Sequence, residues 1–230
     1  MKTVIVVAII CSAAIASAQQ AQVPQGGIAD LLARGRAGKF DGLTQTCGAS
    51  RNRSIIGGLI GGGWMQAGSN ANEHSEPTAY TVTLMAARGW IANRAGDAAR
   101  TKTPLTESDV PAAWLASALW VVVEPQMPAG HEPGRLTALA VIGLETDSDR
   151  RNVPPTERPI AMVGELAHAA RTWTQYGKTP QDYDSASAAF DPVPVLTLRG
   201  DRIAVKITTA NGVTGCDVDR VNVRKLLTVK

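Results

Sequence analysis

The stretch that decides the fold class is VPVLTLRGDRIAVKITTANGVTGCDVDRVNVRKLLTV, residues 193–229. Its first half contains two apolar runs, residues 193–198 and 202–208, whose branched side chains favour strands. Gly200 and Asp201 stand between the runs, and such a pair suits the tight turn of a β-hairpin. We therefore predict that the two runs pair as antiparallel strands.

The second half of the stretch predicts one more turn and one more strand. Asn211 and Gly212 open the turn, and residues 217–229 form the strand. Its alternating valines imply one buried face, with an irregularity between Val218 and Val221.

Two more strands are predicted upstream, over residues 119–124 and 136–145, because both runs are apolar and rich in branched side chains. A short helix is predicted after Ser108 and Asp109, with Pro111 in its first turn.

Two longer segments have the apolar spacing of helices. The first is predicted to begin at Ser75, a helix-capping residue type, and to end near Gly96. A strand over residues 80–85 is the competing interpretation for part of this segment. The second, over residues 160–173, is the clearest amphipathic pattern in the chain, and we predict a helix there. Its apolar positions are Ile160, Val163, Leu166, Ala170 and Trp173.

Strands that come in hairpins and helices that come in clusters indicate the α+β class. We predict a domain over residues 75–230, built as an antiparallel sheet of about five or six strands with helices packed on one face. Residues 19–53 are predicted to be loosely structured, with a short helix over residues 28–36. Residues 54–74 are a glycine-rich segment that we predict to be a loop or an edge strand.

The N-terminus has the pattern of a secretory signal peptide. A positive start is followed by an uncharged, mostly apolar run over residues 3–15, and Ala-Ser-Ala then supplies small residues for cleavage after Ala18. As a helix the run measures roughly 20 Å, less than the roughly 30 Å of a bilayer core. We therefore expect removal of residues 1–18 and a secreted or periplasmic protein.

Cleavage removes Cys11 and leaves Cys47 and Cys216. A pair of cysteines in an oxidising compartment predicts a disulfide bond, worth on the order of 4 kcal/mol in the chain-entropy model. The alternatives are two free thiols or an intermolecular bond. Neither cysteine has the neighbours of a zinc site.

Charge and composition bear on the partners. The 230 residues carry a formal net charge of +3, which is too weak for a basic stripe, so we expect no nucleic-acid partner.

A glycine-rich run extends from Gly57 to Gly63, within sixteen uncharged residues. This run makes contact with a membrane or self-association an alternative to a simple loop.

The three histidines all lie near carboxylates. Glu165 and His168, three residues apart on the predicted helix, share a face and with His74 make a candidate metal site; His168 is also a candidate general base. The competing interpretation is a solvated polar face. A second candidate is the loop between the strands at 119–124 and 136–145, which offers His131 and Glu132 to a ligand.

The motifs of common enzyme families, HExxH, GxSxG, GxGxxG and SxxK, do not occur in the chain. We therefore predict a non-enzymatic binding domain that contacts another envelope component through its sheet surface or its glycine-rich segment, without a cofactor. The alternative is a periplasmic hydrolase, metal-dependent in one version, that uses His131 or the Glu165/His168 pair. A third hypothesis is a small-ligand carrier with a pocket near Trp120 and His131. Trp114 and Trp120 are candidates to line a pocket, and a place in the core is the competing interpretation for both.

Overall fold

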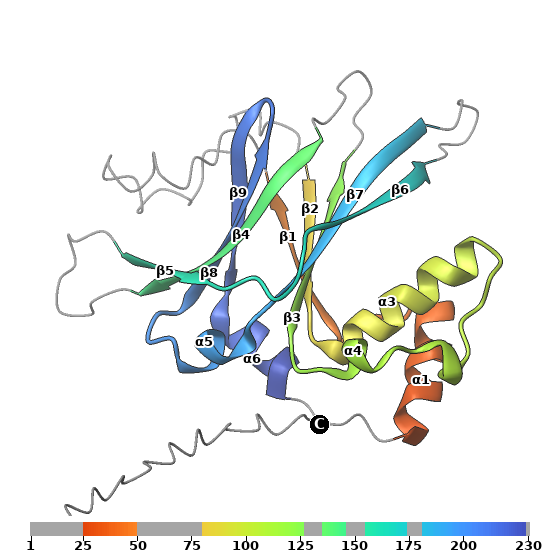
Figure 1. Cartoon of the computed structure of the whole chain (residues 1–230). Helices are drawn as coiled ribbons and strands as arrows, with labels where there is room; N and C mark the ends of the chain where they lie inside the picture. The colour runs from red at the N-terminus through yellow and green to blue at the C-terminus, as the bar shows by residue number, and fades with distance from the viewer. Residues whose placement is uncertain (1–24, 50–79, 127–134, 146–154, 174–180, 229–230) are drawn as a thin grey trace, which may run out of the picture.

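The computed structural model describes residues 25–49, 80–126, 135–145, 155–173 and 181–228 (Figure 1). These residues form two antiparallel sheets and two groups of helices, so the predicted α+β class is confirmed. The predicted signal peptide, the glycine-rich residues 54–74, His74, His131 and Glu132 lie outside the described residues.

Instead of one sheet of about five or six strands, the described residues contain a five-stranded and a four-stranded sheet. The five-stranded sheet has the order β1 (Thr44–Ala49), β2 (Tyr80–Met85), β3 (Leu119–Pro125), β7 (Gln181–Phe190) and β6 (Ala167–Trp173). The four-stranded sheet has the order β5 (Thr156–Ile160), β4 (Leu136–Glu145), β8 (Arg202–Thr209) and β9 (Gly212–Asp219).

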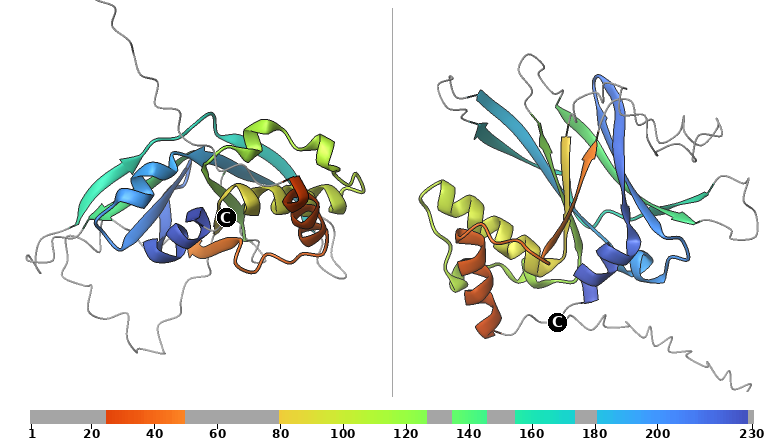
Figure 2. Two further views of the ribbon diagram at one scale, coloured as in Figure 1. Left: turned by 90° about the horizontal axis from the view of Figure 1, so that it is seen from below. Right: turned by 180° about the vertical axis from the view of Figure 1, so that it is seen from behind.

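The main core lies between the two sheets. Val121 and Val123 of β3 point into it and meet side chains of the other sheet such as Val205 and Ile207. Trp120 and Val122 alternate with them and therefore point to the opposite, outer face. Val223 of α6 (Arg220–Thr228) is buried in the main core, so this helix covers one end of the space between the sheets (Figure 2).

The helices on the outer face form a second core. They are α1 (Gln25–Arg36), α3 (Ala87–Arg100), a 3-10 turn (Glu107–Asp109) and α4 (Ala112–Leu115). Leu31 and Leu32 of α1 pack against Ile91 of α3. At Gly35 of α1 an added Cβ would lie 2.0 Å from the carbonyl oxygen of Ala92, so this crossing requires glycine.

The predicted cysteine pair is confirmed in the geometry. The sulfur atoms of Cys47 and Cys216 lie 2.04 Å apart, at disulfide distance. Cys47 lies on edge strand β1 and Cys216 on edge strand β9, so the bond joins the two sheets where their edges meet.

Several predicted elements are confirmed. The strands predicted at 119–124 and 136–145 are β3 and β4, and the helix predicted at 28–36 lies within α1. The short helix predicted after residue 109 is α4. Residues 80–85 form β2, the competing interpretation there, and the helix begins only at Ala87.

The helix predicted over residues 160–173 is wrong. These residues end β5 and form β6, with Gly164 between them at a φ of 102° that a right-handed helix excludes. β6 pairs with β7 in register from Ala167 opposite Ser187. Pairing across the sheet thus overrides an apolar spacing that matched a helix by coincidence.

The hairpin predicted across Gly200 and Asp201 is also wrong. Residues 193–197 belong to helix α5 (Pro192–Thr197), which is capped by the Asp191 carboxylate accepting from the Val193 N–H at 2.9 Å. Proline in the first turn favours this helix start. The hairpin forms one turn later, between β8 and β9, where Asn211 and Gly212 predict a turn.

The strand predicted over residues 217–229 ends at Asp219. The Asp219 carboxylate accepts a hydrogen bond of 2.7 Å from the Val221 N–H, and helix α6 follows. The predicted irregularity at residues 218–221 is therefore the change from strand to helix. In the N-terminal segment that we predicted to be loose, residues 44–49 form strand β1.

None of the helices in the described residues is long and apolar enough to cross a membrane.

Candidate functional site

Helix α3 places a row of side chains against the outer face of the five-stranded sheet. Trp90, near the start of the helix, packs on Met85 of β2 and Val122 of β3. Asp97, two turns later, is ion-paired with Arg171 of β6. The helix therefore bridges strands from the middle of the sheet to its edge.

Three tryptophans meet at the first of these contacts. The Trp90 and Trp120 rings are stacked, with centroids 4.2 Å apart and planes 2° from parallel, and Trp114 meets Trp90 edge-on at 6.0 Å. The Arg94 guanidinium lies 5.5 Å from the Trp90 ring centre and 5.8 Å from that of Trp114. Trp90 is buried, whereas Trp114 and Trp120 keep part of their surface exposed.

Polar atoms are buried without partners in the same place. Among the described residues, Trp90 Nε1, Trp120 Nε1 and Asn93 Oδ1 have no hydrogen-bond partner. Leaving a buried donor or acceptor unsatisfied costs about 1–3 kcal/mol, and natural folds keep such groups rare. The fold therefore retains two donors and one acceptor that its own contacts do not use.

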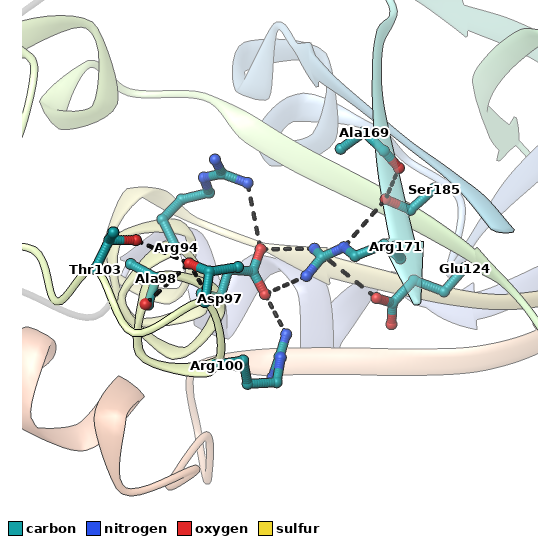
Figure 3. Close-up of polar contacts among 10 residues, drawn as sticks. Arg94, Asp97, Ala98, Arg100, Thr103, Glu124, Ala169, Arg171 and Ser185 are labelled. Carbon is teal, nitrogen blue, oxygen red and sulfur yellow. Dashed lines mark hydrogen bonds and ion pairs between the residues drawn. The ribbon is translucent and has the colours of Figure 1, made fainter. Parts of the chain in front are cut away.

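Asp97 is the centre of an arginine cluster (Figure 3). Arg171 donates to both carboxylate oxygens of Asp97 at 2.6 Å. Arg94 Nη1 donates to Oδ2 at 3.2 Å, and Arg100 Nη2 donates to Oδ1. The Asp97 carboxylate is thus buried under three guanidinium groups, the kind of pairing that makes burial of a charge tolerable.

Arg171 is fixed from both sides. Its Nε donates to Ser185 Oγ at 3.3 Å, and that hydroxyl donates to the Ala169 carbonyl at 3.0 Å. Glu124 lies 3.9 Å from Arg171 Nη2. Burial lowers the pKa of Arg171, but the hydrogen bonds and charge of Asp97, together with Glu124, outweigh burial and raise the pKa above its ordinary value.

Tyr183 lies opposite Arg171 in the β6–β7 register, and the same charges affect the pKa of its phenol. Burial of the phenol and the nearby negative charge of Glu124 raise its pKa, against the opposing effect of Arg171 and Arg100. The phenol is therefore neutral across the physiological range.

We call Trp90, Trp114, Trp120, Arg94, Arg100, Arg171 and Asp97 the α3 cluster. Sequence reasoning suggested Trp114 and Trp120 as pocket residues, and the structure brings both to Trp90. It missed the arginines. Their signal was the spacing of Arg94, Asp97 and Arg100, three residues apart along one helix stripe.

The predicted histidine site has a different geometry. Glu165 and His168 do not share a helix; Glu165 precedes β6, and His168 lies on it. His168 Nδ1 instead lies 2.7 Å from Asp184 Oδ2 on β7, and Arg135 Nε lies 3.5 Å from the same oxygen. In the described part of the chain, no three metal-ligating side chains are grouped closely enough to hold an ion.

No protein-family model, curated protein or solved structure is significantly similar to this chain.

Proposed function

We propose that the chain is a non-enzymatic binding domain of the cell envelope, secreted or periplasmic after removal of residues 1–18, and that the α3 cluster is its binding site. The observation that carries this proposal is the convergence of Arg94, Arg100 and Arg171 beside partly exposed tryptophans. Arginine and tryptophan are the residue types that dominate binding energy at protein surfaces.

The cysteine pair supports the compartment. A bond between Cys47 and Cys216 holds the two sheets together, and such bonds persist in oxidising environments such as the periplasm and the extracellular space. The expected signal peptide leads to the same compartments.

Retention on the envelope tests the proposal. The tagged full-length chain is expressed in its own cells, the compartments are separated, and the mature protein is added back to washed envelopes with and without the double substitution Arg100→Gln/Trp114→Ala. We expect the wild type to leave the cytoplasm and to sediment with envelopes, and the double variant to remain in the supernatant. The matched charge control is Arg224→Gln, on exposed α6 surface, and it should sediment like the wild type.

Cytoplasmic retention of the wild type, or equal sedimentation of the wild type and the double variant, would contradict the proposal.

A second candidate function, hydrolysis, is favoured by one contact. The 2.7 Å contact between His168 and Asp184 resembles the pairing that orients a general base. Activity of the mature protein on ester, amide or glycoside substrates that disappears in His168→Ala would support the hydrolase over the binding domain. Activity that needs added zinc and is lost in Glu165→Gln would support its metal-dependent version.

A further inference from the structure

We propose that the α3 cluster binds a saccharide that carries carboxylate groups. This inference rests on the proposed function, because it names the ligand class of the same site. Three features carry it: the charge balance of the cluster, the geometry of its guanidinium groups, and the aromatic surroundings of Arg94.

The charge balance favours an anion. Arg94, Arg100 and Arg171 supply three positive charges, and Asp97 and Glu124 supply two negative ones, which leaves one positive charge in excess. Arg171 uses both terminal nitrogens on Asp97. In the described part of the chain, Arg94 and Arg100 each use one nitrogen on this carboxylate, and their side chains are 35% and 63% exposed. A guanidinium has five N–H donors, so most of the donors of Arg94 and Arg100 are not used on Asp97.

The geometry of the guanidinium groups favours a carboxylate over other anions. The two parallel bonds from Arg171 to Asp97 show that the cluster already holds one planar carboxylate in its centre. Arginine binds a second carboxylate in the same forked manner when its outer nitrogens are available. Arg94 and Arg100 lie on either side of Asp97 along the helix, so an acidic ligand meets two cations at once.

The surroundings of Arg94 favour a saccharide over other ligands that carry carboxylate groups. Arg94 lies against the Trp90 and Trp114 rings, so apolar aromatic surface directly adjoins the cation. A sugar ring combines an apolar C–H face with hydroxyl groups that both donate and accept. This combination matches the aromatic surface that Trp114 keeps partly exposed beside the N–H donors of Arg94.

The test is calorimetric titration of the mature protein with trigalacturonate, which carries a carboxylate on every ring. Its methyl ester has the same skeleton without the charges, and inorganic phosphate is an anion without a sugar. We expect trigalacturonate to bind, and the ester and phosphate each to bind at least about tenfold more weakly, since charge-assisted forked bonds are lost.

Variants locate the site. Arg100→Gln is expected to weaken trigalacturonate binding about tenfold, because one cation is lost, and Trp114→Ala is expected to weaken it by a similar factor. Arg224→Gln should leave the affinity within about twofold. Arg100 is largely exposed, so its substitution preserves the fold, which the thermal midpoint of unfolding verifies.

Equal binding of acid and ester, tighter binding of phosphate, equal weakening by Arg224→Gln, or no binding of trigalacturonate would each overturn this ligand class. If the wild type then still sediments with envelopes through the α3 cluster, the proposed function stands and only the saccharide inference fails. If envelope retention is lost as well, both fail.

Discussion

Replacement of Asp97 by asparagine tests the energetic role of the arginine cluster. Asparagine keeps the shape of the side chain and removes its charge, so three guanidinium groups lose their shared counterion. The Arg171 side chain is only 16% exposed and stays buried without its partner. Removal of one partner from a buried ion pair typically costs 3–5 kcal/mol.

Arg94 and Arg100 are more exposed and can turn toward water, so each contributes less than about 1 kcal/mol. Because asparagine still accepts one hydrogen bond, we expect Asp97→Asn to lower the free energy of unfolding by about 3 kcal/mol.

The assay is urea unfolding followed by tryptophan fluorescence, with Asp30→Asn on the exposed surface of α1 as the matched control. The control should change the free energy of unfolding by less than about 0.5 kcal/mol. Arg171→Met should cost less in the Asp97→Asn background than in the wild type, by at least about 1 kcal/mol, since the pair is then already broken. A loss of less than about 1 kcal/mol for Asp97→Asn, or additive costs, would refute the reasoning.

Three further predictions concern the rest of the fold. The double substitution Cys47→Ala/Cys216→Ala should lower the free energy of unfolding in urea by about 5 kcal/mol in the chain-entropy model, because the bond spans 169 residues; a loss below about 1 kcal/mol would contradict the stabilising role of this bond. Gly35→Ala should lower the free energy of unfolding by about 1–3 kcal/mol despite the higher helix propensity of alanine, because its Cβ would meet the Ala92 carbonyl; unchanged or increased stability would show that α1 shifts freely. Absorbance at alkaline pH should show a phenol titrating above the ordinary tyrosine value of about 10 that is absent in Tyr183→Phe and shifts downward in Glu124→Gln; no downward shift would contradict the effect of Glu124. Because the pKa of Tyr183 is raised in the folded protein, its contribution to stability is complete below about pH 10 and declines as the pH rises through the folded-state value.

The sequence predicts the strands whose residue composition by itself favours a strand. Residues 119–124 and 136–145 are apolar and branched, and they form β3 and β4 as expected. Composition alone does not predict strand β6. Its residues Ala167, His168 and Ala169 have no strand preference and are ordered by pairing with β7.

Local caps explain the other errors. Asp191 and Asp219 each cap a helix start, at α5 and α6, inside a stretch whose branched residues favour strands. In each case the carboxylate accepts a hydrogen bond from the backbone N–H two residues later, which favours the helix start over a continued strand. The runs predicted as strands, residues 193–198 and 217–229, therefore include residues of helices α5 and α6.

The candidate site was predictable only in part. Trp114 and Trp120 are close in sequence and were candidates to line one pocket, and both contact Trp90. The contact between Asp97 and Arg171 spans 74 residues, and it depends on a strand that the apolar spacing assigned to a helix. No local pattern carries such a contact.

The central claim is that the α3 cluster is the binding site, and side-chain NMR during a titration with trigalacturonate tests it most directly. The account predicts progressive shifts of the arginine Nε–H signals of Arg94 and Arg100 and of the indole N–H of Trp114, with Arg224 unchanged. Shifts confined to other side chains, such as His168 or Arg224, would contradict it.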